Sequence, residues 1–356
     1  MKSPESVIEV NLEAVRRNLQ VLQKKSGTKS VMAVVKVNAY NHGAVRCSRF
    51  LEPLVDGYAV ATMDEAVELR EGGIENEILV FGAPTEKSAE IYPEYDLSAT
   101  LSDTAHFDLL RPGTTCHILF DTGMRRMGFH PEQAENVREM TENYPGLRYK
   151  GIYSHYATAD EPGSGFVHEQ NQGFQLLRKQ FPDEWQTHMS NSAAVLHYQN
   201  LRHFDMIRVG IGLFGYASGR AQIDELIPAL TWKSRISQTR RLNEGDPVSY
   251  SSRWRCPSDG LLGTIPVGYA DGVPRSLFGK LNVCADGKFY PVVGNITMDA
   301  CMVFLGKDSI AAGTPVTLMG GEGWWVDKWA EEAGSIPHEI FCGLGRRAEY
   351  RYFSEQ

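Results

Sequence analysis

Five polar residues stand at or just after the ends of short apolar runs, where a catalytic face could form. They are Lys36, Arg126, His155, Ser192 and Arg208. A lysine behind an apolar run is unusual, because a buried ammonium group is costly unless it is paired or neutralised. One interpretation is a side chain that extends out to solvent at the end of a strand. The other is a lysine whose amine forms a Schiff base with a carbonyl compound.

The ends of the last two apolar runs have residues that suit a phosphate group. A phosphate dianion favours backbone N–H groups and hydroxyls at the last two strands of a barrel. Ser192, Gly210 and Ile211 stand there, and Tyr40 follows Lys36 by one short loop. Ser192 is also compatible with a simple N-cap, and Gly210 with a tight turn, so these residues alone leave both alternatives open.

Strand-like and helix-like segments alternate over about the first 220 residues and would position these groups. Eight short apolar runs recur, and amphipathic stretches such as 63–70 and 131–144 separate them. Eight strands alternating with helices are typical of a (β/α)₈ barrel, whose catalytic groups lie at the C-terminal ends of the strands. A doubly wound sheet shares the alternation but usually has fewer strands. The runs are Val31–Val37, Tyr58–Thr62, Ile78–Gly82, Leu97–Leu101, His117–Asp121, Gly151–His155, His188–Ser192 and Met206–Phe214.

The pattern changes after about residue 225, where strand-like alternation predominates. Trp232, Ser234 and Ile236 fall on one face of such a strand, and Asp286-Gly287 predicts a hairpin turn. One helix is expected near 326–333. The sequence therefore predicts an α/β protein with an N-terminal (β/α)₈ TIM-type barrel over 1–225 and a C-terminal β-rich domain over 226–356. The expected boundary segment is Ser218–Ile227.

Composition excludes several classes of protein. The length of 356 residues favours two domains, and the net charge of −8, without a run of Lys or Arg, argues against nucleic-acid binding. No apolar run approaches the roughly 20 residues of a membrane span, and residues 1–11 do not resemble a signal peptide. The six cysteines lack CxxC or zinc-finger spacing, so thiols are expected and no metal site is. These features predict a cytoplasmic protein.

Seven motifs, in order along the chain, resemble those of alanine racemases, which are pyridoxal 5′-phosphate (PLP) enzymes of fold type III. VVKVNAYNHG resembles the PLP-lysine motif K-A-N-A-Y-G-H-G, and DTGMRRMG resembles D-T-G-M-G-R-L-G. The other five are HMSNSAA, IRVGIGLFG, VSYSS, IPVGYADGVPR and GNITMDACM. Seven motifs in the family's order, spanning both predicted domains, make chance agreement negligible.

The resemblance implies a PLP-dependent racemase that interconverts L- and D-alanine by a two-base mechanism and supplies D-alanine for cell-wall peptidoglycan. Lys36 would hold PLP and act as one base, and Tyr250 would act as the other. Arg208 would contact the pyridine nitrogen, and since an arginine does not give up its proton, PLP would be a weak electron sink. The positions that match the family's other cofactor contacts are Tyr40, His155, Ser192, Gly210 and Ile211.

The resemblance also implies a homodimer with shared active sites. Arg126 and the backbone N–H of Met298 would bind the substrate carboxylate. Tyr250, Tyr269, Met298 and Asp299 would face the partner subunit's Lys36. His155 would hydrogen-bond the catalytic tyrosine, and His188 would support this arrangement together with Tyr269 and Asp299.

This chain departs from the family pattern at several positions. Leu119 stands where many racemases have a lysine that becomes carbamylated and holds the substrate-binding arginine, so Arg126 must be oriented by something else. Thr297 replaces a cysteine and Phe214 a tyrosine. The tail reads GRRAEYRY where the family often has Y-R-V-P-R, which leaves open whether Tyr350 or Tyr352 contacts the phosphate.

Three other functions are compatible with parts of this pattern. A racemase of another small amino acid, such as serine, would share every motif, in either a biosynthetic or a catabolic role. A non-racemase PLP-binding barrel protein would share the barrel and its lysine but has no β domain, so residues 226–356 count against it. A fold-type III decarboxylase carries an acidic residue at the pyridine nitrogen, so Arg208 and Tyr250 argue against it.

Overall fold

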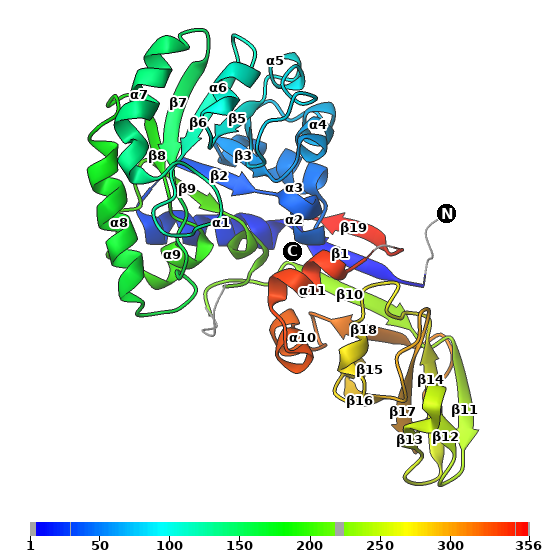
Figure 1. Ribbon diagram of the computed structural model, residues 1–356. Coiled ribbons are helices and arrows are strands. Elements are labelled where there is room, and N and C mark those ends of the chain that lie inside the picture. Colours follow the sequence, from blue (N-terminus) through cyan, green and yellow to red (C-terminus); the bar gives the residue numbers. More distant parts are fainter. Residues whose placement is uncertain (1–4, 29, 218–223, 346, 355–356) are drawn as a thin grey trace. The chain divides into compact units, whose positions relative to one another are not determined.

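The computed structural model describes residues 5–28, 30–217, 224–345 and 347–354, and the chain divides into two compact units (Figure 1). One unit is Ala14–Ile227, and the other combines Met1–Glu13 with Pro228–Gln356. The boundary expected at residue 225 therefore differs in the N-terminal segment, which belongs to the β-rich unit. Part of the expected boundary segment, residues 218–223, lies outside the described residues.

Pairing between distant strands explains the place of the N-terminal segment. β1 (Val7–Asn11) pairs antiparallel with β10 (Leu230–Arg235) and parallel with β19 (Glu349–Phe353). Ile8 and Val10 alternate with more exposed residues and are fully buried. The strand therefore packs its apolar face into the core of the β-rich unit, although it precedes the barrel in the sequence.

The unit Ala14–Ile227 is built on a closed barrel of eight parallel strands, which confirms the predicted fold class (Figure 1). The barrel closes where its first strand pairs with its last, with Val31 opposite Ile207. Each strand overlaps one of the eight apolar runs, although β8 shares only His188 with the run expected at His188–Ser192. The strands are β2 (Ser30–Val34), β3 (Gly57–Val60), β4 (Glu77–Val80), β5 (Ser98–Leu101), β6 (Thr115–Leu119), β7 (Arg148–Tyr153), β8 (Gln186–His188) and β9 (Met206–Val209).

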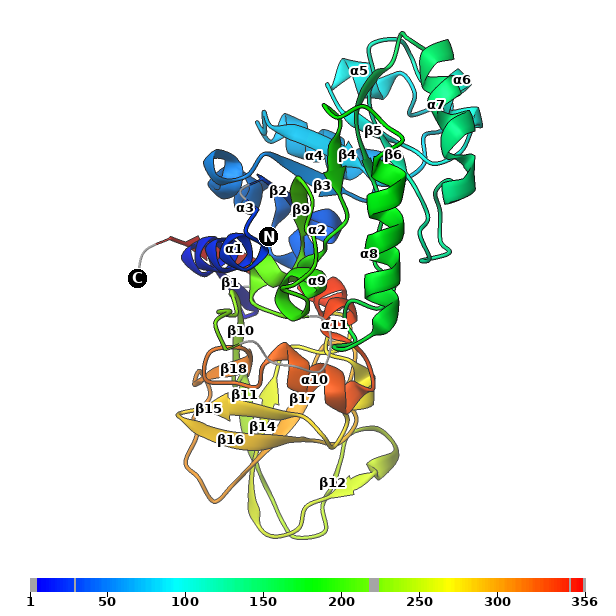
Figure 2. The same cartoon turned by 90° about the vertical axis from the view of Figure 1, so that its left-hand side faces the viewer.

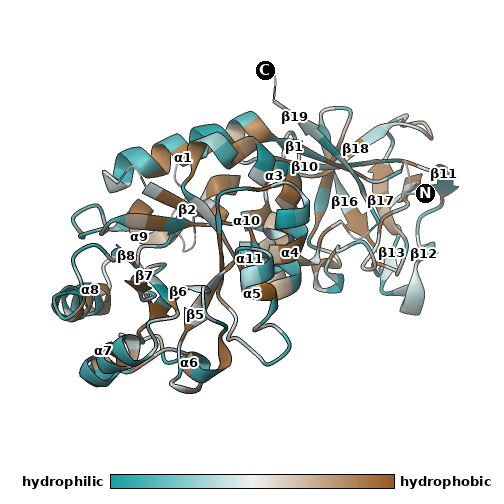
Figure 3. Ribbon diagram, turned by 90° about the horizontal axis from the view of Figure 1, so that it is seen from above, coloured by the Kyte–Doolittle hydropathy of each residue, from teal (hydrophilic) through white to brown (hydrophobic). Residues whose placement is uncertain are grey.

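Helices connect the barrel strands. In α1 (Leu12–Ser26), the apolar residues at spacings of three and four are buried, and Figure 3 shows this helix striped teal and brown. In α4 (Met63–Glu71), Thr62 and Glu65 form a capping box that defines the helix start. None of the described helices is long and apolar enough to cross a membrane. The others are α2 (Lys36–Asn41), α3 (Ala44–Leu51), α5 (Ile91–Glu94), α6 (Ala105–Leu109), α7 (Ala134–Asn143), α8 (Gly165–Arg178) and α9 (Ser192–His197).

All barrel strands except β5 end before the expected runs do, and the difference matters most for the site at the first and last strands. The first strand ends at Val34, so Lys36 lies just beyond it rather than closing it. The last expected run, Met206–Phe214, is a strand only to Val209 and then becomes the 3-10 helix η3 (Ile211–Phe214). Both breaks occur where the backbone turns sharply to present polar groups at the end of the barrel.

The β-rich unit contains a nine-stranded sheet in the order β11-β14-β17-β16-β15-β18-β10-β1-β19 (Figure 2). The hairpin β15–β16 turns at Asp286 and Gly287, with φ of 49° and 71°, as the Asp-Gly signal predicted. Trp232 is fully buried and packs near Trp329, with ring centroids 6.0 Å apart. The remaining elements are β11 (Gln238–Leu242), β12 (Pro247–Val248), β13 (Trp254–Arg255), β14 (Gly260–Ile265), β15 (Asn282–Ala285), β16 (Lys288–Val293), β17 (Cys301–Gly306), β18 (Pro315–Met319), α10 (Val326–Ala333) and α11 (Pro337–Gly343).

Candidate active site

The C-terminal ends of the barrel strands bring four of the predicted site residues into one region. Burial, and then repulsion by Arg208, Arg126 and Lys36, lowers the pKa of His155 to about 3. Charges shift a neighbour's pKa strongly only at short range, so the three cations are near this imidazole, and Arg208 Nη2 lies 3.3 Å from its Nδ1. His155 is therefore neutral at physiological pH and stands among positive groups that suit an anionic ligand.

The backbone after Lys36 adopts an uncommon left-handed conformation. Residues 37–41 all have φ between 51° and 59°. For residues other than glycine or asparagine this costs about 1–2 kcal/mol each, so the surrounding structure must hold the segment in place. The Val37 N–H donates to Glu65 Oε1 at 2.6 Å, and the Ala44 N–H donates to Asn38 Oδ1 at 2.8 Å. Strain maintained in this way is typical of functional sites.

A cradle suited to phosphate lies at the ends of β8 and β9. Ser192 Oγ accepts the backbone N–H groups of Gly210, at 3.0 Å, and Gly212, at 3.2 Å. A Cβ on Gly210 would lie 2.3 Å from Tyr40 Oη, so only glycine permits this approach. Ile211 begins η3 directly after Gly210. The structure thus brings together all four residues predicted to contact phosphate, and their hydroxyl and N–H groups fit such a ligand.

Arg208 is buried and held by barrel groups through both terminal nitrogens. Nη1 donates to the His188 carbonyl at 2.8 Å and to His188 Nδ1 at 3.0 Å. Nη2 donates to the Ser154 carbonyl at 2.7 Å and contacts His155 Nδ1 at 3.3 Å. Burial lowers the Arg208 pKa to about 10, so the group remains charged at neutral pH. A fixed guanidinium of this kind can donate to a pyridine nitrogen without releasing its proton.

The hydrogen bond to Arg208 also determines the tautomer of His155. A guanidinium only donates hydrogen bonds, so His155 Nδ1 must accept. The neutral imidazole then carries its proton on Nε2. This N–H group is the donor that a tyrosine oxygen at the site would require.

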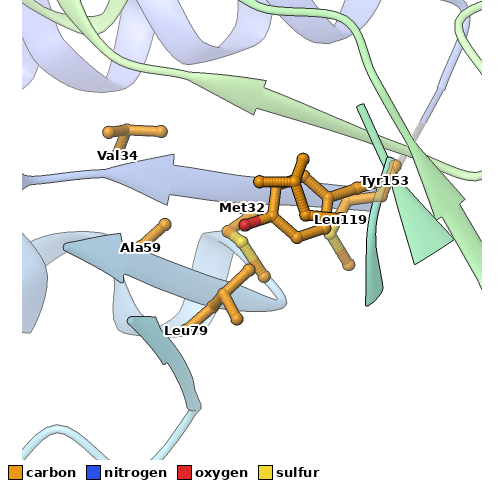
Figure 4. Close-up of a cluster of buried hydrophobic side chains, with 7 residues drawn as sticks. Met32, Val34, Ala59, Leu79, Leu119 and Tyr153 are labelled. Atoms are coloured by element: carbon orange, nitrogen blue, oxygen red, sulfur yellow. The ribbon is translucent and has the colours of Figure 1, made fainter. Parts of the chain in front are cut away.

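Leu119 belongs to a buried apolar cluster of the barrel (Figure 4). Met127 packs against the cluster from the loop that carries Arg126. Arg125, in the same loop, has a positive φ of 59°. Within the described ranges the Arg126 side chain has no hydrogen-bond partner, and the packing of Leu119 and Met127 positions its loop. The cluster consists of Met32, Val34, Ala59, Leu79, Leu119, Tyr153 and Met206.

Loops of the β-rich unit present three large side chains to solvent. Tyr250, Tyr269 and Met298 are 73%, 44% and 53% exposed. Asn295 Nδ2 donates to the Tyr250 carbonyl at 2.6 Å, and the Tyr269 N–H donates to the Thr297 carbonyl at 3.0 Å. The 294–299 loop is therefore bonded to both tyrosine-bearing loops. Exposed apolar side chains gathered in this way are typical of an interaction surface.

The structure adds Arg347, which sequence reasoning did not select. Arg347 Nε and Nη2 donate to the two carboxylate oxygens of Asp271, at 2.6 and 2.7 Å. Nη1 donates to Asp299 Oδ1 at 2.7 Å, so Arg347 joins the predicted Asp299 to the loop after Tyr269. The one sequence feature that could have pointed to Arg347 is the tail, which departs from the family pattern. Tyr350 and Tyr352, in β19, lie beside each other with ring centroids 6.3 Å apart.

In the described part of the chain, neither the cysteines nor other side chains that bind metals form a second functional site. All six cysteines are free thiols, and Cys342 alone among them is exposed. No group of three or more His, Cys, Asp or Glu side chains among the described residues could hold a metal ion. The polar groups at the barrel end therefore remain the candidate site.

Comparisons with known proteins match both units. The sequence matches the family model described as "Alanine racemase, N-terminal domain" over residues 10–218 and the one described as "Alanine racemase, C-terminal domain" over 229–352. An alanine racemase of Desulforamulus reducens is 35% identical, with 97% of this chain and 98% of the relative covered. Among solved structures, alanine racemase from E. faecalis is 30% identical, with 98% of each chain covered and a TM-score of 0.92. A histidine racemase from Leuconostoc mesenteroides is 28% identical, with 99% of this chain and all of that chain covered and a TM-score of 0.92.

Proposed function

The chain belongs to the alanine racemase family, and from this premise we propose that Lys36 and Tyr250 are the two bases with which it interconverts L- and D-alanine. Enzymes of this family depend on PLP, which when bound makes the Cα–H bond of an amino acid acidic. The observation that carries the proposal is the convergence of Lys36, Arg208 and the phosphate cradle at one end of the barrel. The product D-alanine would supply peptidoglycan synthesis. A chiral assay on alanine, in protein reconstituted with PLP, tests the proposal directly.

The binding residues divide by the part of the cofactor or substrate that they hold. Tyr40, Ser192, Gly210 and Ile211 bind the phosphate, and the Arg208 guanidinium donates to the pyridine nitrogen. Arg126 and the backbone N–H of Met298 bind the substrate carboxylate. These assignments are supported by the Ser192 and Gly210 hydrogen bonds and by the charge that Arg208 retains.

We propose that the enzyme is a homodimer in which the β-rich unit of one subunit completes the barrel site of the other. The high exposure of Tyr250, Tyr269 and Met298 in this chain supports such an interface. His155 Nε2–H would then donate to the tyrosine oxygen and stabilise the phenolate that accepts a proton. Arg347 would position Asp299 at the same surface.

Mixing two inactive variants tests the shared site. Lys36→Ala and Tyr250→Ala chains should each be inactive alone, and partial activity should return when they exchange subunits. In a mixed dimer one site has both defects and the other has neither. Differently tagged chains establish exchange, and each variant mixed with itself is the control. If exchanged dimers stay inactive, each site is built from a single chain.

A second prediction follows from Leu119 and concerns the effect of bicarbonate on activity. Lysine carbamates form from carbon dioxide, whereas Leu119 has no amine and lies in an apolar cluster. We therefore expect racemisation to be unchanged when bicarbonate is removed or added. Assays in degassed and bicarbonate-supplemented buffer give the comparison, and intact-mass measurement checks for a carbamate. A carbamylated lysine beside Arg126 would contradict this account of the loop.

Alanine is the proposed substrate, and the alternatives are outcomes of the same assay. The Leuconostoc relative acts on histidine, which motivates including histidine and serine in the chiral assay. A clear preference for histidine or serine would show that the chain is a racemase of that amino acid and not of alanine. The match of residues 229–352 to a racemase C-terminal domain counts against a PLP-binding barrel protein without racemase activity. We also propose a cytoplasmic location, which the free thiols support.

A further inference from the structure

A continuous row of hydrogen bonds runs through the barrel from Arg208 to Glu77. Arg208 Nη1 lies 3.0 Å from His188 Nδ1, and His188 Nε2 lies 2.9 Å from His117 Nδ1. His117 Nε2 lies 3.0 Å from Glu77 Oε1. His188 and His117 are fully buried, and Arg208 is nearly so. The four side chains come from β9, β8, β6 and β4, so the row crosses the barrel between strands that are not all neighbours.

The chemistry of the two ends gives the row a single direction. Arg208 can only donate, so His188 Nδ1 accepts and His188 Nε2 carries the proton. That proton is donated to His117 Nδ1, which leaves the His117 proton on Nε2. His117 Nε2–H then donates to the Glu77 carboxylate. An additional proton on either imidazole would place two donors face to face, so both rings are neutral.

Glu77 is itself fixed as an acceptor. Lys150 Nζ donates to its Oε2 at 2.7 Å, and Ser98 Oγ donates to its Oε1 at 2.7 Å. Burial alone would raise the Glu77 pKa, but the hydrogen bonds from His117 and Lys150 and the nearby charge of Lys150 lower it. Glu77 begins β4, so it stands at the end of its strand opposite to the catalytic face. The carboxylate remains ionised there at every physiological pH.

The barrel is shaped to admit this row. A Cβ on Gly151 would lie 2.3 Å from the Gln186 carbonyl oxygen and 3.1 Å from His117 Nδ1, so a larger residue would clash with the backbone and crowd the imidazole. The pairing of β6 with β7 shifts register between Cys116 and His117. Tyr153 stacks on His188, with ring planes 5° apart and centroids 4.9 Å apart. These contacts orient each imidazole for its hydrogen bonds, and the two rings lie at 73° to each other.

We propose that Glu77 is a positioning residue of the racemase, which fixes the tautomers of His117 and His188 so that a lone pair of His188 holds the Arg208 guanidinium in place. The proposal rests on the function proposed above, in which Arg208 contacts the pyridine nitrogen. Without the carboxylate, the His117 Nε2–H group would be buried and unsatisfied, and a reversed row would satisfy it. The reversed row points the His188 Nδ1–H group at the guanidinium, which would have to move.

The test compares Glu77→Gln with Glu77→Met in the PLP-loaded enzyme. Glutamine keeps an oxygen that can accept from His117, whereas methionine has similar length but no comparable acceptor. Side-chain ¹⁵N spectra of histidine-labelled protein report the tautomers, with His117→Gln and His188→Gln variants used to assign the signals. Wild type and Glu77→Gln should show both rings neutral and protonated on Nε2. Glu77→Met should shift both rings toward a mixture of tautomers.

Kinetics and cofactor retention provide the second readout. In Glu77→Met, kcat should fall by about 10–100-fold, the usual effect of losing a partner that orients a functional group. KM for alanine should change little, because Arg126 and not Arg208 binds the carboxylate. PLP should dissociate more readily, which dialysis followed by absorbance measures. Glu77→Gln should recover most of kcat, and the control Lys150→Met, which retains the carboxylate, should show the wild-type tautomers.

Several results would overturn the proposal. A wild-type spectrum with His117 protonated on Nδ1, or with a charged imidazole, contradicts the direction of the row even if no variant folds. A folded Glu77→Met enzyme with wild-type tautomers and kcat would show that Glu77 does not position Arg208. Equal losses in the Gln and Met variants would also contradict it. Since the spectra do not depend on turnover, failure of the proposed racemase activity would remain distinguishable from failure of this inference.

Discussion

Replacing Lys36 with alanine is expected to abolish covalent PLP binding and racemisation together. The lysine amine is the group that would attach the cofactor, and Lys36 is the one lysine among the cations that lower the pKa of His155. A single acid–base group typically contributes about 10²–10⁴-fold to a rate, and loss of covalent attachment adds to this. The purified variant should therefore lose the absorbance band at the edge of the visible range that the wild type shows after reconstitution. Chiral assays should detect no turnover above background.

Borohydride makes the Lys36 test specific. Reduction should fix PLP irreversibly to the wild-type chain, and peptide mass spectrometry should find the adduct on Lys36. Lys179→Ala provides a matched control, because it removes an exposed lysine at the end of α8 that belongs to neither the catalytic face nor the row of hydrogen bonds. A wild-type protein that binds no PLP after reconstitution, or an adduct on a different lysine, would refute the assignment.

Tyr250→Phe is expected to lower racemisation by roughly 10²–10⁴-fold while PLP binding is preserved. Phenylalanine removes the acid–base oxygen but keeps the ring and its packing. The phosphate cradle and Lys36 are in the barrel unit, so the absorbance band should be unchanged. Because Asn295 bonds the Tyr250 backbone carbonyl and not its side chain, the loop should keep its conformation.

Deuterium exchange distinguishes the faces on which the two bases act. The family resemblance implies that lysine removes the proton from D-alanine and tyrosine from L-alanine. In deuterium oxide, Tyr250→Phe should therefore lose α-proton exchange of L-alanine more severely than that of D-alanine. Tyr290→Phe, which removes a hydroxyl bonded to Asp308, is a control for loss of a tyrosine oxygen elsewhere in the same unit. The reverse asymmetry would mean that the faces are exchanged, and equal retention would make Tyr250 a structural residue.

The approximate positions of the barrel strands and of one hairpin turn could be predicted because their signals are local. Each of the eight apolar runs overlaps a strand, although the run at His188–Ser192 does so only at His188, and the Asp286-Gly287 pair forms the expected hairpin. The spacing of Leu12, Val15 and Leu19 predicted a helix whose apolar face is buried. Such periodicities and turn preferences depend on the backbone geometry of a few consecutive residues, which the sequence records directly.

The choice of site residues depended on motifs, and the structure explains why those residues lie together. Ser192 and Gly210 are separated by 18 residues, yet a serine oxygen accepts the glycine N–H. Parallel strands of a barrel place their C-terminal ends on one face, so residues far apart in sequence converge there. Arg347 carried no such motif, and its ion pairs with Asp271 and Asp299 became evident only in the folded chain.

By itself, then, the sequence determined the number and order of the barrel strands and the family, and it indicated the lysine that we propose to carry PLP. Tertiary structure alone decided that Val7–Asn11 belongs to the β-rich sheet, because strand pairing joins segments more than 200 residues apart. It also decided that residues 37–41 turn left-handed, since bonds from Glu65 and Asn38 stabilise an otherwise unfavourable backbone. The link from Glu77 to Arg208 is likewise tertiary. Hydrogen-bond direction depends on which atoms meet in space, and neither periodicity nor spacing along the chain contains that information.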